Sequence, residues 1–208
     1  MSTKVTIVDY GLGNLHSVNN ALTHLGADVT IATDASGLDG AGHVILPGVG
    51  AFRDGMEGLR ARGQDVALRQ HVLEGRPLLG ICLGAQLLMS ESEEFGLCEG
   101  LDIIPGRVIK IPHEGVKVPL VGWRQLQISG TVAPASSVLT PEEDGAWMYF
   151  VHSYHCVPAD PGHLLATVAH GSHRIHAAVA RDTVCGLQFH PEKSGPRGIQ
   201  ILARFFAS

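Results

Sequence analysis

The stretch Pro77-Leu78-Leu79-Gly80-Ile81-Cys82-Leu83-Gly84-Ala85-Gln86-Leu87-Leu88-Met89 decides how this chain is organised. Its first half is an apolar run that follows a proline and has the length of a buried strand. Its second half has the composition of a helix. A cysteine, Cys82, stands at the junction between two glycines, which is the strand–turn–helix context of a nucleophile elbow.

The residues around Cys82 suit a nucleophile. Side chains at Gly80 and Gly84 would crowd the tight turn and a substrate. The start of a helix favours a thiolate, and the Leu83 N–H there would point toward an oxyanion formed at an attacked carbonyl. The alternative is a small buried residue with no chemical role. The two glycines together with Gln86 favour the nucleophile.

Composition limits the classes of protein to consider. With 208 residues, of which 45% are hydrophobic and 17% charged, the chain is expected to form one compact domain over residues 1–208. A net charge of −5 does not suggest nucleic-acid binding. No apolar run approaches the ~18 residues of a membrane span, and no signal-peptide pattern opens the chain. Four scattered cysteines without a C-x-x-C pair predict no disulfide framework and fit a cytoplasmic location.

The first half of the chain alternates strands and helices. Strands are expected over residues 5–9, 28–32 and 43–46 and in the apolar run that follows Pro77, with helices over 14–25 and 64–74. Asn14 is expected to cap the first helix. This alternation predicts a parallel sheet with right-handed crossovers. Gly11 and Gly13 begin a dinucleotide-binding pattern, but His16 stands where its third glycine belongs, so nucleotide binding is not expected.

The second half is richer in short strands. They are expected over residues 107–111, 121–128, 146–151, 164–168, 175–180 and 184–189, followed by an amphipathic helix over 198–206. No linker or repeat separates the halves. The predicted fold class is therefore α/β, as a single three-layer domain with a mixed, mainly parallel sheet.

A glycine-rich loop, Pro47-Gly48-Val49-Gly50-Ala51-Phe52, follows the third strand. In such sheets ligands bind at the carboxyl ends of the strands, so this loop and Cys82 are expected to face one pocket. Glycines on both sides of Val49 let the backbone approach a ligand closely. The alternative is an ordinary loop between a strand and a helix.

The segment Gln188-Phe189-His190-Pro191-Glu192 offers what a thiol nucleophile needs. A base must take its proton, and the base needs an acceptor that orients it. Since the chain holds 12 histidines, one beside a glutamate means little alone. Together with the elbow, it predicts a triad of Cys82, His190 and Glu192.

These two motifs, residues 80–86 and 188–192, resemble those of the class I (triad) glutamine amidotransferases, whose fold is flavodoxin-like. The resemblance implies that Cys82 attacks the amide of glutamine and releases ammonia, after which water hydrolyses the glutamyl thioester. His190 would act as base and acid, and Glu192 would orient it. It also implies an oxyanion hole at Leu83, Val49 and Gly50, and glutamine contacts at Gly48, Gly50, Gln86, Ser153 and Tyr154. No cofactor or metal is implied.

Three other stretches, residues 10–15, 47–52 and 117–124, are similar to one branch of this family, the glutaminase subunits of imidazole glycerol phosphate synthase from histidine biosynthesis. That branch implies a heterodimer with a separate (β/α)₈-barrel cyclase, because 208 residues cannot add a barrel. The interface motif of that branch usually reads Pro-His-Met-Gly-Trp-Asn, and Leu120 and Arg124 depart from it. The resemblance places Gly11, Asn14, Pro119 and Trp123 at the partner interface.

Other functions stay open at this stage. The chain could serve another synthase, act as a stand-alone cysteine hydrolase or peptidase, or be a non-catalytic binding subunit. The spacing His170-x-x-His173-x-x-His176 could suggest a metal. However, Gly171 and Ser172 indicate a turn between strands, and alternation along the next strand would scatter the rings, so no metal site is expected.

Overall fold

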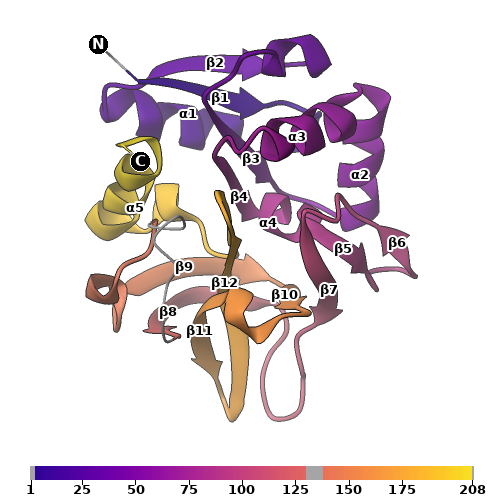
Figure 1. The fold of residues 1–208 in the computed structure, drawn as a ribbon. Coiled ribbons are helices and arrows are strands. Elements are labelled where there is room, and N and C mark those ends of the chain that lie inside the picture. The colour runs from indigo at the N-terminus through magenta and orange to yellow at the C-terminus, as the bar shows by residue number, and fades with distance from the viewer. Residues whose placement is uncertain (1–2, 130–137, 208) are drawn as a thin grey trace.

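The computed structural model describes residues 3–129 and 138–207, which form three layers (Figure 1). A nine-stranded sheet is the middle layer. Helices α1 (Leu15–His24) and α5 (Gly195–Ala207) share one hydrophobic core with it. The other core takes in α2 (Phe52–Ala61), α3 (Gln64–Leu73), α4 (Leu83–Leu87) and a smaller sheet. The predicted three-layer α/β domain is confirmed.

The large sheet is mixed, as expected. Strand pairs are parallel from β2 through β1, β3 and β4 to β13, and antiparallel from β13 through β12, β11 and β8 to β9. The elbow therefore lies in the parallel half. The strands are, in spatial order, β2 (Asp28–Ala32), β1 (Lys4–Val8), β3 (His43–Gly48), β4 (Leu78–Cys82), β13 (Val184–Leu187), β12 (His173–Arg181), β11 (Leu164–His170), β8 (Leu120–Ile128) and β9 (Trp147–His152).

A second, four-stranded sheet packs beside α4. Its order is β10 (Tyr154–Pro158), β7 (Ile104–Lys110), β5 (Met89–Ser92) and β6 (Cys98–Glu99). Of these, only β7 is predicted from the sequence. Strands of two to five residues carry too little alternation to stand out. Short 3-10 turns complete the fold at Ala35–Leu38, Pro141–Glu143, Pro161–His163 and Pro191–Lys193.

Helix α2 is also absent from the sequence prediction, because its two glycines lower helix propensity. Both glycines lie where other chain segments come close. A Cβ at Gly58 would lie 2.4 Å from the Tyr10 carbonyl oxygen, and one at Gly55 would lie 3.1 Å from Leu87. Close packing between α2 and its neighbours therefore takes precedence over helix propensity.

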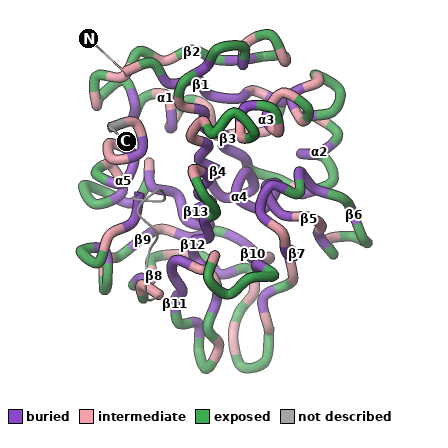
Figure 2. The backbone as a smooth tube through the Cα atoms, in the orientation of Figure 1, coloured by how far each residue is buried: buried purple, intermediate pink, exposed green. Residues whose placement is uncertain are grey.

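Strand β4 lies in the centre of the molecule, where all five of its residues are buried (Figure 2). Helices cover both faces of a parallel sheet, so its strands are apolar throughout rather than alternating. That is why Leu78–Cys82 is predictable as a strand. No helix in the described part of the chain is long and apolar enough to cross a membrane.

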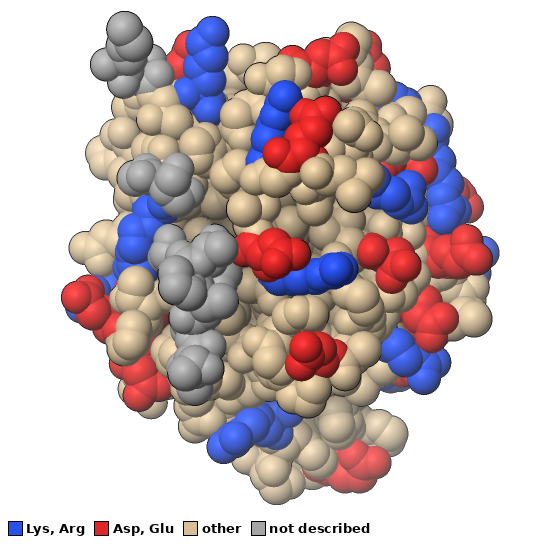
Figure 3. All heavy atoms as spheres, viewed as in Figure 1, with Lys and Arg blue, Asp and Glu red and all other residues tan. Residues whose placement is uncertain are grey.

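The surface carries both signs of charge. On the face shown in Figure 3, acidic and basic side chains are interspersed, and most of the surface belongs to other residues. This mixture agrees with the modest net charge of −5.

Candidate active site

Cys82 occupies a strained turn between β4 and α4. Its backbone has φ 57° and ψ −110°, and its side chain is buried. A positive φ is uncommon for a residue with a Cβ, and such strain persists where the surrounding structure holds it. This is the sharp strand-to-helix turn that the sequence predicts, and it places the sulfur at the carboxyl end of the parallel sheet.

The two glycines of the elbow are required by close packing of the backbone. A Cβ at Gly84 would lie 1.7 Å from the carbonyl oxygen of Leu46, and one at Gly80 would lie 2.7 Å from the carbonyl oxygen of Gly84. The crowding that the sequence predicts therefore comes from β3 and from α4 itself. Any side chain at these positions would push the elbow away from the sheet.

The neighbouring strand β13 brings His190 to the same edge. Its Leu187 pairs with Ile81 in parallel register, so the residues after β13 emerge beside Cys82. His190 is buried, and its backbone N–H donates to the Tyr149 carbonyl on β9 at 3.0 Å. Its ring Nδ1 lies 2.9 Å from Glu192 Oε1, and the Glu192 side chain is fully buried.

The electrostatics of the pair favour a charged imidazole. Burial of the ring opposes its charge, but the Cys82 sulfur and the Glu192 carboxylate outweigh that effect and raise the pKa of His190 to about 9. Nδ1 is held by the carboxylate, whereas buried Nε2 has no hydrogen-bond partner among the described residues. The ring can therefore take a proton from the thiol and carry it as an imidazolium.

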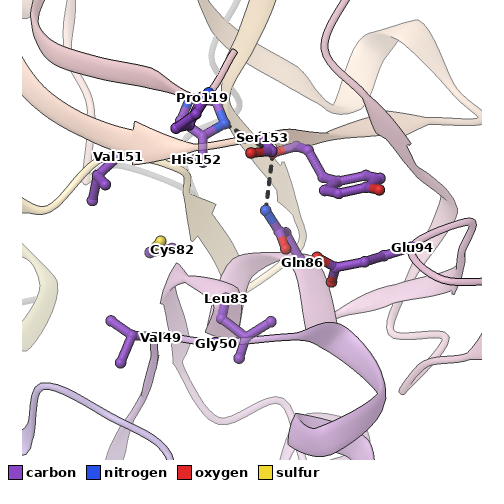
Figure 4. Close-up of a pocket in the computed structure, with 11 residues that line it drawn as sticks. Val49, Gly50, Cys82, Leu83, Gln86, Glu94, Pro119, Val151, His152 and Ser153 are labelled. Carbon is purple, nitrogen blue, oxygen red and sulfur yellow. Dashed lines mark hydrogen bonds between the residues drawn. The ribbon is translucent and has the colours of Figure 1, made fainter.

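A pocket of about 360 Å³ opens over the sulfur (Figure 4). Most of the residues predicted to act in catalysis, in the oxyanion hole or in glutamine binding line it. They are Val49, Gly50, Cys82, Leu83, Gln86, Ser153 and Tyr154, together with Pro119 at its edge. His190 and Glu192 are not among the lining residues. Gly48 is buried and is not among them either; a Cβ there would lie 2.1 Å from the Tyr10 hydroxyl.

Gln86 is fixed against the pocket wall. Its side-chain amide donates to the carbonyl of Tyr154 at 3.0 Å, drawn as a dashed line in Figure 4, and to Gln188 Oε1 at 3.1 Å. Gln188 in turn lies 3.9 Å from the Cys82 sulfur. These contacts connect the nucleophile to the 153–154 segment. They hold the Gln86 side chain in place at the pocket.

Three lining residues, Glu94, Val151 and His152, are not found from the sequence. Glu94 lies across the pocket from Cys82 in Figure 4, and its Oε2 accepts a hydrogen bond from the Phe52 N–H at 2.7 Å. It follows β5, a strand that sequence patterns do not reveal. His152 donates from Nδ1 to the Tyr154 carbonyl at 2.8 Å. Burial lowers the pKa of His152 to about 4, so its ring is neutral.

The predicted interface residues fall in two places. Pro119 directly precedes strand β8 and Trp123 lies within it, where Trp123 is 45% exposed, as predicted. Trp123 pairs with Tyr149 across β8 and β9, with ring centres 6.0 Å apart. The exposed apolar side chains on this pair of strands form what we name the β8–β9 face. They are Val121, Trp123, Trp147 and Val151.

Gly11 and Asn14 lie in the loop between β1 and α1, where Gly11 is exposed and Asn14 is half-buried. The predicted capping role of Asn14 is wrong. Asn14 stands at the N-cap position, but its side chain makes no capping hydrogen bond within the described residues. Its amide instead donates to Glu192 Oε1 at 3.3 Å.

The three spaced histidines do not converge. Rings of His170, His173 and His176 contact three different carbonyl oxygens, those of Lys117, Glu114 and Cys156. Across residues 3–129 and 138–207, no group of three or more His, Cys, Asp or Glu side chains could hold a metal ion.

The Glu192→Gln variant tests the charge pairing at this site. Because the pKa of folded His190 lies above its ordinary value of 6.5, its charged form contributes stability that is complete below that pH and lost as the pH rises through about 9. Removing the carboxylate should lower the free energy of unfolding by roughly 1–2 kcal/mol near pH 6. The deficit should shrink above pH 9, as measured by urea denaturation at both pH values.

The matched control is Glu57→Gln, an exposed carboxylate on α2. It should change stability little at either pH. A deficit of Glu192→Gln that is the same at both pH values would contradict the pairing of Glu192 with a charged His190.

Comparison with solved structures shows the same fold. A chain of a structure described as PurLQS from Thermotoga maritima aligns over 100% of this chain and 99% of its own, with a TM-score of 0.78 at 18% identity. A structure described as a glutamine amidotransferase covers 97% of this chain and 96% of its own, with a TM-score of 0.72 at 22% identity.

Comparison with protein sequences finds relatives that are more similar in sequence than these solved structures. The family model described as "Glutamine amidotransferase class-I" matches residues 6–208. Proteins described as "Imidazole glycerol phosphate synthase subunit HisH" are 48% identical in Halobacterium salinarum (97% of this chain, 91% of the relative) and 45% in Synechococcus sp. strain JA-3-3Ab (98% and 93%). That of Chlorobaculum tepidum is 41% identical (97% and 98%). The chain therefore belongs to the class I glutamine amidotransferase family.

Proposed function

We propose that this chain is the glutaminase subunit of an imidazole glycerol phosphate synthase, and that it hydrolyses glutamine to glutamate and ammonia. The observation that carries the proposal is the buried Cys82–His190–Glu192 arrangement, with Cys82 lining an open pocket. The HisH relatives, 41–48% identical over nearly the whole chain, support the synthase and its place in histidine biosynthesis.

In the first step His190 takes the thiol proton, and the Cys82 sulfur attacks the amide carbon of glutamine. Negative charge then develops on the amide oxygen, which needs hydrogen-bond donors already in position. The N–H of Leu83 follows the nucleophile directly, and the Val49–Gly50 segment lies on the same side of the pocket as Leu83, at the end of the strand that pairs with β4. Gly50 has φ 118°, which leaves this segment a conformation that other residues rarely adopt.

The remaining steps return the enzyme to its starting state. His190 gives its proton to the leaving nitrogen, so ammonia departs and a glutamyl thioester stays on Cys82. Water, deprotonated by the same ring, then attacks the thioester and releases glutamate. Glu192 holds the ring by Nδ1 throughout, so Nε2 handles each proton.

The pocket also suits the amino-acid end of glutamine. The Glu94 carboxylate, across from the sulfur, is placed to pair with an α-ammonium group. The backbone of Ser153 and Tyr154 lies beside it and would receive the α-carboxylate, with Gln86 fixing that wall. A volume of about 360 Å³ accommodates a small ligand of this kind.

We further propose a heterodimer in which ammonia passes to a (β/α)₈-barrel cyclase in the cytoplasm. The β8–β9 face supports a partner there, since exposed aromatic residues are common anchors of interfaces. This face lies next to the triad, because Tyr149 on β9 binds the His190 N–H through its carbonyl and the Ser194 hydroxyl through its N–H. Ser194 also donates to the His190 carbonyl.

The function is tested by measuring glutamate release from glutamine by the pure chain, alone and with a cyclase subunit and its nucleotide substrate. Cys82→Ser should abolish release, because a serine hydroxyl forms its anion far less readily than a thiol. Cys98→Ser, which changes another buried cysteine, should retain activity. Near-wild-type release by Cys82→Ser would contradict the assignment. Peptide hydrolysis without any partner would favour a stand-alone hydrolase, and stimulation by a different synthase would reassign the pathway.

The Trp123→Ala variant tests the β8–β9 face as the partner site. Because the side chain is 45% exposed, its removal should leave the melting temperature nearly unchanged. It should weaken cyclase binding by roughly tenfold or more, as expected for an interface anchor of ~2 kcal/mol. Binding is measured by titration calorimetry. Leu73→Ala, an exposed apolar residue on α3, should not affect binding. Unchanged affinity of Trp123→Ala would move the interface elsewhere.

A further inference from the structure

We propose that Asn14 is a positioning residue of the triad, whose side-chain amide holds the Glu192 carboxylate against His190. The inference rests on the proposed triad. It assigns to the loop between β1 and α1 a direct role in the chemistry, through a hydrogen bond between segments 178 residues apart in sequence.

The first observation is that Asn14 does not do what its position suggests. Its carbonyl accepts the first hydrogen bond of α1, from Val18 N–H at 3.3 Å, which marks it as the N-cap residue. Asparagine is among the best side chains for capping the free N–H groups there. Yet the described residues contain no such capping bond, and the amide points to Glu192. The Asn14 side chain therefore contacts the triad instead of capping helix α1, which lacks the stability that a capping hydrogen bond would add.

The second observation concerns the carboxylate itself. Oε1 of Glu192 receives both the His190 ring at 2.9 Å and the Asn14 amide at 3.3 Å. Oε2 is buried and has no hydrogen-bond partner among the described residues. The carboxylate is therefore held on one side only. If the amide were lost, the imidazole would be its remaining polar contact in the described part of the chain, and nothing else would fix its orientation.

The third observation is that the loop carrying Asn14 and the helix that follows it lie close to two other segments of the site. The loop lies near the end of β3 that leads to Val49, since a Cβ placed at Gly13 would come within 3.8 Å of Pro47 Cγ. Helix α1 also packs against the 3-10 turn Pro191–Lys193, which carries Glu192. Asn14 therefore stands where the loop, the glycine-rich segment and the triad turn meet.

Two variants separate positioning from capping. Asn14→Ser keeps a good N-cap residue but is too short to reach Glu192. Asn14→Asp keeps the cap and the shape, but it places a second carboxylate where the amide donates. Asn14→Ser should retain the wild-type melting temperature, whereas Asn14→Asp should lower it, because its carboxylate repels that of Glu192. With the cyclase and its nucleotide substrate present, kcat for glutamine should fall about tenfold in Asn14→Ser, and further in Asn14→Asp, with KM unchanged.

A second measurement does not depend on glutamine turnover. The rate at which iodoacetamide alkylates Cys82 in the isolated chain, followed by peptide mass, reports how readily the thiolate forms. It should fall several-fold in Asn14→Ser. The control is Asn20→Ser on the same helix, whose amide forms a hydrogen bond with the exposed His16 ring, and it should match wild type in every assay.

The outcomes distinguish the two proposals. If wild type hydrolyses glutamine and alkylation and kcat are unchanged in Asn14→Ser, Asn14 has no positioning role. If wild type does not hydrolyse glutamine, the proposed function fails, and the alkylation rates alone still decide whether Asn14 supports the Cys82–His190–Glu192 arrangement. A lower melting temperature with unchanged kcat and alkylation would identify Asn14 as merely structural.

Discussion

The close approach of the elbow to strand β3 is the constraint on which the rest of the structure depends. Gly84 lies so near the Leu46 carbonyl that no side chain fits between them. That contact seats α4 on the sheet and forces the chain to reverse at Cys82 with a positive φ. Such a conformation costs ~1–3 kcal/mol and persists only where packing holds it. Here the fully buried β4 and the apolar side chains of Leu83 and Leu87 hold it. The strain therefore serves to present the sulfur to the pocket.

Everything else at the site is placed relative to that sulfur by strand register. Parallel pairing of β13 with β4 brings His190 beside Cys82, and parallel pairing of β3 with β4 brings the glycine-rich segment to its other side. The antiparallel half of the sheet then connects the site to the surface. Tyr149 on β9 binds the His190 backbone, while its strand partner Trp123 is exposed. A partner bound to the β8–β9 face would thus be connected to His190 of the triad through one intervening residue, Tyr149. Asn14 would provide a second route, through Glu192.

The sequence predicts the parts of this arrangement that have strong local signals. The apolar run 78–82, the flanking glycines and the His190-Pro191-Glu192 segment each carry a physical requirement that can be read locally. Glu94 escapes prediction because it follows β5, a short strand without clear alternation, and His152 escapes because the alternation that predicts β9 does not show that its last residue lines the pocket. Helix α2 escapes because its packing requires glycines that disfavour helices. Asn14 is the most instructive case. Its residue type and position indicate a cap, and only the packing of α1 against the 191–193 turn reveals the competing acceptor.

The most direct test of the central claim is covalent labelling by a glutamine analogue that carries an electrophile at its side-chain end. The account predicts that mass mapping finds the label on Cys82, that the cyclase accelerates labelling and that glutamine protects against it. Cys98, Cys156 and Cys185 should remain unmodified, because all three are buried and line no part of the pocket. Label on any of these three, or labelling of Cys82 that glutamine does not slow, would contradict the claim that Cys82 is the nucleophile of a glutamine site.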